Sequence, residues 1–315
     1  MSQAAQVRPR PETPVPSAPK GRQPTSERTR AEYRLAWTLC APAVVVMLAV
    51  TAYPIGYAIY LSLMRYDLRF PERKEFVGLA NYVTVLTSSF WWTALWVTVF
   101  ITVISVTAEF VIGMALALLM QRTLIARGLM RTVILIPYGI VTVVAAYSWY
   151  YAWTPGTGYL ANLLPSGSAP LTEQWPSLMI IILAEIWKTT PFMSLLLLAG
   201  LVQIDDSVIR AAKVDGASSW QRFIRVIVPL MKPTIVVALL FRTLDAFRIY
   251  DNIYILTNGA HNTASVSILA SDNLTIALNL GVGSAVAILI LVAVAIISMV
   301  FIKGLGAAAP GQAVN

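Results

Sequence analysis

Six long apolar segments run through the sequence and restrict what the chain can fold into. A helix needs about 20 mostly apolar residues to cross a bilayer core about 30 Å thick. Only 12% of the 315 residues are charged, whereas soluble domains carry about a quarter. We therefore predict an all-α membrane protein with six transmembrane helices. The predicted spans are 36–63, 92–120, 132–153, 177–202, 234–256 and 279–302.

Positive charges are distributed unevenly between the predicted loops. With the N-terminus inside the cell, the inner segments contain sixteen Lys and Arg residues and the outer loops contain four. This is the positive-inside pattern, and it predicts that both termini are cytoplasmic. Membrane topology thus explains the net charge of +8, and we do not expect nucleic acid as a partner. The four outer residues are Arg65, Arg69, Arg73 and Lys74.

Two tails flank the predicted membrane domain. Residues 1–30 contain six prolines and very few bulky apolar side chains. Such a segment cannot bury enough surface to offset the entropy lost on ordering. We expect residues 1–35 to form a disordered cytoplasmic tail, residues 36–304 to form one six-span domain, and residues 305–315 to form a short C-terminal tail.

The longest predicted inner loop, residues 203–233, has a helix–turn–helix pattern. An Asp or Ser at positions 205–207 can cap a first helix, and Gly216 marks the turn after it. A second helix, from about 218 to 228, would be broken by the prolines that follow. A helical knob of this kind can dock in the groove of a soluble partner, with Trp220 and Phe223 as apolar anchors.

The pattern of small residues in this loop resembles the pattern found in the coupling loop of one family. That family comprises the permease subunits of binding-protein-dependent ABC importers. That family has Glu-Ala-Ala, then Gly six residues after the Glu, and a Pro near the end of the second helix. The sequence departs from the family at Arg210, where Glu is usual. Two other stretches, 77–82 and 242–259, resemble the sugar branch of the family. The resemblance assigns ATPase coupling to Arg210, Ala211, Ala212, Asp215, Gly216, Trp220, Phe223 and Pro229.

The resemblance implies a type I ABC importer permease fold in the plasma membrane of a bacterium, with a cytoplasmic coupling helix. The implied partners are a second permease subunit, two ATP-binding cassette subunits, an extracytoplasmic sugar-binding lipoprotein and membrane lipids. No cofactor is expected on this chain, because ATP and Mg would be bound by the partner subunits. The implied substrate is a disaccharide such as trehalose. Arg210 suggests asymmetric docking beside a non-identical second permease.

Charged residues inside the predicted spans have two interpretations, because burying an ion in a bilayer is unfavourable unless it pairs or faces a wet cavity. They either lock helices together or line the translocation path. Oppositely charged neighbours three residues apart can pair along a helix. We assign Arg242 and Asp245 to structure, and the second span adds Glu109. The predicted substrate path is Glu185, Lys188, Arg248, Asp251 and Tyr254.

Several kinds of chemistry find no support in the sequence. It has no Gly-x-x-x-x-Gly-Lys-Ser/Thr phosphate loop, and its single histidine and single cysteine do not form a metal-binding pattern. We therefore expect a transport subunit without its own ATPase site. Two alternatives remain at this point. One is an ion-coupled secondary transporter or channel, and the other is a membrane enzyme that acts on lipid-linked sugars through Asp205 and Asp206.

Overall fold

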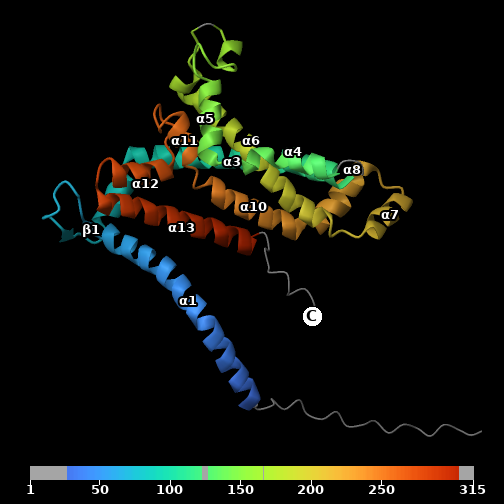
Figure 1. The fold of residues 1–315 in the computed structure, drawn as a ribbon, viewed down its shortest axis with the longest axis horizontal. Coiled ribbons are helices and arrows are strands. Elements are labelled where there is room, and N and C mark those ends of the chain that lie inside the picture. The colour runs from blue at the N-terminus through green and yellow to red at the C-terminus, as the bar shows by residue number, and fades with distance from the viewer. Residues whose placement is uncertain (1–26, 123–126, 166, 305–315) are drawn as a thin grey trace, which may run out of the picture. The chain divides into compact units, whose positions relative to one another are not determined.

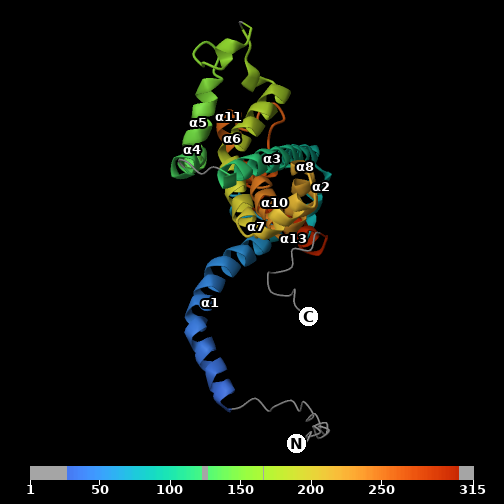
Figure 2. The ribbon, with the colours of Figure 1, turned by 90° about the vertical axis from the view of Figure 1, so that its right-hand side faces the viewer.

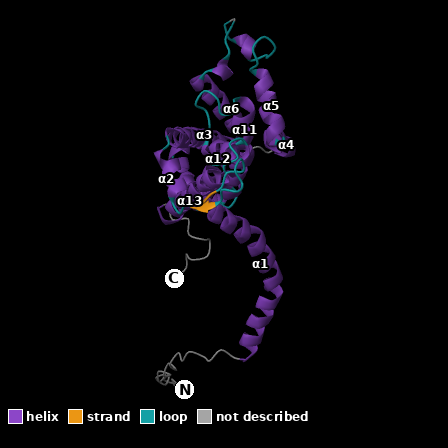
Figure 3. Ribbon diagram, turned by 90° about the vertical axis from the view of Figure 1, so that its left-hand side faces the viewer, coloured by secondary structure: helices purple, strands orange, loops and turns teal. Residues whose placement is uncertain are grey.

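The computed structural model describes residues 27–122, 127–165 and 167–304, which are mostly helical (Figures 1 and 3). The chain divides into two compact units at Ile55 and Gly56. The described part of the first unit is residues 27–55 of helix α1, which runs from Glu27 to Ser62.

Helix α1 begins inside the predicted N-terminal tail, so the expectation of disorder is wrong for residues 27–35. This stretch contains Glu, Arg, Ala and Leu, which favour helix, and it has neither Gly nor Pro. The remainder of that tail, residues 1–26, and the predicted C-terminal tail, residues 305–315, lie outside the described residues.

The second unit contains the other secondary structure elements. A short antiparallel hairpin pairs β1 (Met64–Arg65) with β2 (Glu75–Phe76). Short 3-10 turns lie at Ala161–Leu163 and Pro170–Thr172. The helices are α2 (Ala80–Thr87), α3 (Ser89–Arg122), α4 (Arg127–Gly139), α5 (Thr142–Ala152), α6 (Gln174–Leu201), α7 (Asp206–Val214), α8 (Ser219–Arg222), α9 (Val228–Leu230), α10 (Lys232–Ala246), α11 (Asp251–Leu256), α12 (Val266–Thr275) and α13 (Leu280–Gly304).

Four of the six predicted spans are single helices that are long and apolar enough to cross a membrane. These are Tyr33–Ser62, Ser89–Gln121, Gln174–Leu201 and Leu280–Gly304. Two further candidates are bent pairs, Gly128–Gly139 with Thr142–Ala152 at 84° and Ser219–Leu230 with Lys232–Leu256 at 72°. The described chain therefore has six spans if each bent pair counts as one.

The predicted span 132–153 is not one continuous helix. It is divided between α4 and α5, where Pro137 lacks an N–H and Gly139 has low helix propensity. The predicted span 234–256 is also interrupted, because α10 ends at Ala246 and α11 begins at Asp251.

The segment 257–278, which connects the last two predicted spans, contains helix α12. Ser265 caps α12 by accepting a hydrogen bond from the backbone N–H of Ile268, at 3.2 Å. Helix α12 packs along α13 and against α3. Ser, Asn and Thr are common in loops, so composition gave no signal for this helix, and tertiary packing decides the structure of a short helix.

Helices α3 and α6 form the centre of the second unit, and α10 packs against both (Figures 1 and 2). Ile101, Ile181 and Leu197 are completely buried there. Helices in lipid associate through close van der Waals packing, which small residues permit. Gly113 of α3 is such a residue, because a Cβ at this position would lie 2.9 Å from Cγ of Met193 on α6.

We predict that Gly113→Leu weakens the contact between α3 and α6. Overpacking a tight contact costs about 1–3 kcal/mol, so the purified protein should lose its folded, monodisperse form at a lower temperature. Gly56→Leu is the matched control, because a Cβ at Gly56 meets nothing within 4 Å. Equal thermal stability of the two variants in detergent would contradict the proposed packing role.

Candidate functional site

A buried arginine joins three carboxylates from three helices. Arg242 of α10 is completely buried. Its Nε and Nη2 donate to the two oxygens of Glu109 on α3, at 2.5 and 2.9 Å. Nη2 also donates to Glu185 of α6 at 2.7 Å, and Nη1 donates to Asp245 at 2.8 Å. The arginine therefore cross-links α3, α6 and α10 at one point.

This arrangement follows from the cost of an ion in a low-dielectric interior. A buried charge is tolerated when it is paired and its remaining hydrogen-bonding capacity is used. The planar guanidinium suits such a site because it presents five donors in a fixed fork. The second oxygen of Glu185 accepts from Nδ2 of Asn252 at 2.5 Å, which adds α11 to the network.

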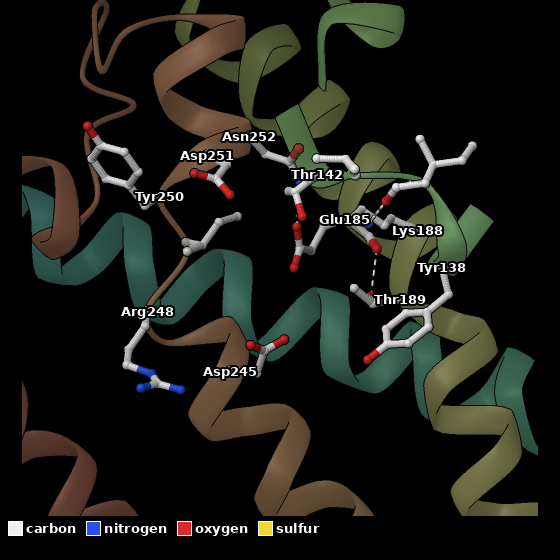
Figure 4. A pocket seen from close by; sticks show the side chains of 13 residues that line it. Tyr138, Thr142, Glu185, Lys188, Thr189, Asp245, Arg248, Tyr250, Asp251 and Asn252 are labelled. Carbon is white, nitrogen blue, oxygen red and sulfur yellow. Dashed lines mark hydrogen bonds between the residues drawn. The ribbon is translucent and has the colours of Figure 1, made fainter. Parts of the chain in front are cut away.

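A polar cavity of about 560 Å³ lies beside this network. Figure 4 shows its lining side chains, which come from α4, α5, α6, α10, α11 and the connections between them. The volume falls within the range of about 300–1,000 Å³ that is usual for small-molecule sites. The lining residues are Tyr138, Ile140, Val141, Thr142, Glu185, Lys188, Thr189, Asp245, Arg248, Ile249, Tyr250, Asp251 and Asn252.

Both interrupted spans meet at this cavity. Residues 140 and 141 lie in the break between α4 and α5, and residues 248–250 lie in the break between α10 and α11. Irregular backbone within a membrane is tolerated where it is buried in protein or lines a water-filled cavity. The helix breaks therefore place backbone carbonyls and N–H groups, in addition to side chains, around the cavity.

Four of the five predicted substrate-path residues line the cavity, namely Glu185, Lys188, Arg248 and Asp251. Tyr254 is absent from the lining and is half-exposed, but its ring stacks on that of Tyr250 with 5.4 Å between centroids.

Pairing between charged neighbours three residues apart on one helix occurs for the two residues assigned to structure, Arg242 and Asp245. Among the described residues, this is the one pair at the expected spacing within the spans. Glu185 pairs with Arg242 instead of Lys188. Beyond Asp245 this spacing is lost because α10 ends at Ala246. Arg248 donates to the carbonyl of Leu244, and it lies apart from Asp251 in Figure 4.

Sequence reasoning missed several lining residues. Tyr138, Thr142, Thr189 and Asn252 reach the cavity only because the helices break and pack there. Glu109 was detectable as a charge within an apolar segment, but its partner Arg242 is 133 residues away in the chain. Position along the sequence gives no signal for such a pair.

The coupling segment, residues 203–233, has the predicted helix–turn–helix form. Asp205 caps α7, because its side chain accepts from the backbone N–H of Ser207 at 2.7 Å. This hydrogen bond holds the pKa of the Asp205 carboxyl below its ordinary value. Gly216 has φ of +81°, a conformation that glycine adopts without a steric penalty. Arg210 and Asp215 are exposed on this segment.

The second helix of the coupling segment contains a π-helical turn, Phe223–Ile227, between α8 and α9. Proline within a helix clashes with the carbonyl four residues earlier, and a wider turn before Pro229 accommodates its ring. The predicted break follows at Met231.

The two aromatic anchors of the coupling segment differ. Phe223 packs against the core that contains Met193 and Leu197, whereas Trp220 is 68% exposed. Trp220 is therefore the more exposed of the two anchors, whereas Phe223 is half-buried.

Comparisons with known proteins decide the family. Residues 77–307 match the family described as "Binding-protein-dependent transport system inner membrane component". The chain belongs to this permease family. The permease is 66% identical, over 89% of its length and 92% of the relative's, to the trehalose transport system permease protein SugA of Mycobacterium tuberculosis. It is 38% identical, over 78% of its length and 85% of the relative's, to the trehalose/maltose transport system permease protein MalF of Thermococcus litoralis.

A solved structure supports the fold. The permease superposes with a TM-score of 0.76 on a chain of a bacterial ABC transporter involved in the import of the acidic polysaccharide alginate. The match covers 89% of the permease and 99% of that chain, at 23% identity. The protein therefore has the type I permease fold of ABC importers and is a bacterial inner-membrane transport subunit. The alternatives of a secondary transporter and of a membrane enzyme are not supported.

We predict that Arg242→Met destabilises the permease strongly. Removing one partner of a buried ion pair costs about 3–5 kcal/mol, because the other charges stay buried without compensation. The yield of folded protein and its thermal midpoint should both fall. Arg248→Met is the matched control, since Arg248 is exposed and forms no ion pair among the described residues. A stable Arg242→Met protein would show that the network does not hold the helices together.

Proposed function

We propose that the permease forms part of the membrane path for a disaccharide, with trehalose as the first candidate. The observation that carries this proposal is the polar cavity at the junction of the two interrupted spans. The two relatives described above transport trehalose, or trehalose and maltose, according to their names.

The cavity has the chemistry that a sugar requires. Hydroxyl groups need hydrogen-bond donors and acceptors, which Lys188, Asp251 and Asn252 supply. The C–H faces of a sugar ring pack against aromatic rings, and Tyr138 and Tyr250 supply two. Positive and negative side chains are mixed around the cavity, which suits a neutral solute better than a strongly charged one.

The energy for transport is proposed to come from partner subunits. ATP and Mg would be bound by two ATP-binding cassette subunits, and the coupling segment would transmit nucleotide-driven closure to the spans. Trp220 and Arg210 are exposed on that segment and would contact the cassettes. An extracytoplasmic binding protein would deliver the sugar. Both termini would be cytoplasmic, as the distribution of Lys and Arg predicts.

The second permease subunit is proposed to be non-identical. A Glu at position 210 would pair with a basic residue of a cassette, whereas Arg210 needs an acidic partner or solvent. Two copies of this chain would therefore present the same atypical residue to both cassettes. A different second permease would keep the usual contact on one side.

We predict that affinity purification of this chain from the membrane recovers two cassette subunits and one copy of a different permease. Native mass spectrometry of the detergent-solubilised complex measures the stoichiometry. A particle that contains two copies of this chain and no other permease would rule out the asymmetric arrangement. Recovery without any cassette subunit would rule out the ATP-driven mechanism.

We predict that Asp251→Ala lowers disaccharide uptake at least tenfold while the complex still assembles. Asp251 lines the cavity and has no ion-pair partner among the described residues, so its carboxylate is available to accept hydrogen bonds from sugar hydroxyls. A hydrogen bond to a charged group contributes about 1.5–3 kcal/mol. Uptake of radiolabelled trehalose into proteoliposomes is the measurement, and Glu72→Gln in an exposed loop is the control. Unchanged uptake would remove Asp251 from the site.

A further inference from the structure

Lys188 of α6 is a buried cation whose only hydrogen bond among the described residues links it to another span. Its side chain is almost fully buried. Nζ donates to the carbonyl oxygen of Ile140 at 2.7 Å, and it lies 6.0 Å from the ring centroid of Tyr138. Ile140 follows the last residue of α4 and lies in the break before α5. Through this hydrogen bond, the lysine links the backbone between α4 and α5 to helix α6.

The backbone carbonyls at the break are well suited to a cationic hydrogen-bond donor. The last carbonyls of a helix lack intrahelical N–H donors, and a cation is stabilised near the C-terminal end of the helix dipole. On the other side of the break, Val141 makes no side-chain cap for α5. The two helices meet at 84°, and among the described residues Lys188 is the side chain that donates to the Ile140 carbonyl.

The ammonium also faces the cavity. A lysine has three N–H donors, and one is used by Ile140. Glu185, one turn earlier on α6, is held by Arg242 and Asn252 and forms no salt bridge with Lys188. The other donors of Lys188 are therefore available to a ligand in the cavity that it lines.

We propose that Lys188 is a positioning residue that ties the break between α4 and α5 to α6 and makes the geometry of the interrupted span sensitive to cavity occupancy. A sugar oxygen in the cavity and the Ile140 carbonyl use the same ammonium, so solute binding and the position of the break are coupled. The part that concerns the sugar rests on the function proposed above. The part that concerns the break does not.

The first test measures the break without any sugar. Hydrogen–deuterium exchange of the complete complex in lipid nanodiscs reports the peptide that covers residues 136–146. Lys188→Met, which keeps the length and removes the donor, should speed this exchange at least tenfold. Lys188→Arg should keep the exchange slow, because it retains a cationic donor.

Thr190→Val is the matched control for that test. Thr190 is also buried on α6, and its hydroxyl bonds only within the helix, to the carbonyl of Ile186 at 2.6 Å. Its replacement should leave exchange in residues 136–146 unchanged. Unchanged exchange in Lys188→Met, or equal acceleration in Thr190→Val, would overturn the positioning role.

The second test concerns the coupling to solute. In proteoliposomes, Lys188→Met should raise the KM for trehalose about tenfold with a smaller change in kcat, because a bond to the bound sugar is lost. Lys188→Arg should recover most of the affinity. An unchanged KM would overturn the coupling to occupancy. Absence of trehalose uptake by the unaltered complex would instead overturn the proposed substrate, and the exchange result would stand independently.

Discussion

The ionic contacts of Arg242 are the interaction on which the rest of the membrane structure depends. Lipid supplies no hydrophobic driving force between helices, so tight packing and buried polar contacts must define their positions. One guanidinium binds carboxylates of α3 and α6 and one on its own helix. These are the same helices that pack together at the centre of the second unit. The network holds one side of the cavity in place, because its members Glu185, Asn252 and Asp245 also line the cavity.

Discontinuous helices give the cavity its polar character. An unbroken membrane helix uses all its interior backbone groups for its own hydrogen bonds and presents only side chains. Here, α4 ends and α11 begins at the cavity wall. Lys188 satisfies the exposed carbonyl of Ile140, so the broken backbone is compensated by a side chain of the neighbouring span. A site of this construction can change shape when a helix segment rotates about its break.

Local chemistry determines the shape of the coupling segment, residues 203–233. Caps at Asp205 and Ser218 define where its two helices begin, and the left-handed conformation of Gly216 sets the turn between them. Phe223 anchors the segment to the core formed with α3 and α6, whereas Trp220 remains exposed. In the function proposed above, a push on the exposed side would reach the spans through these packed side chains.

The sequence by itself determined the membrane class, the positions of the four continuous spans to within a few residues, and the form of the coupling segment, because hydrophobic length, capping residues and glycine act locally. It also indicated that Glu185, Lys188, Arg248 and Asp251 belong near a common site. Only the tertiary structure decided that Glu185 binds Arg242, that α12 is a helix, and where the spans break. Those outcomes depend on contacts such as Glu109 with Arg242 and Ile140 with Lys188. Such contacts join residues far apart in the chain, and no local pattern in the sequence records which of them meet.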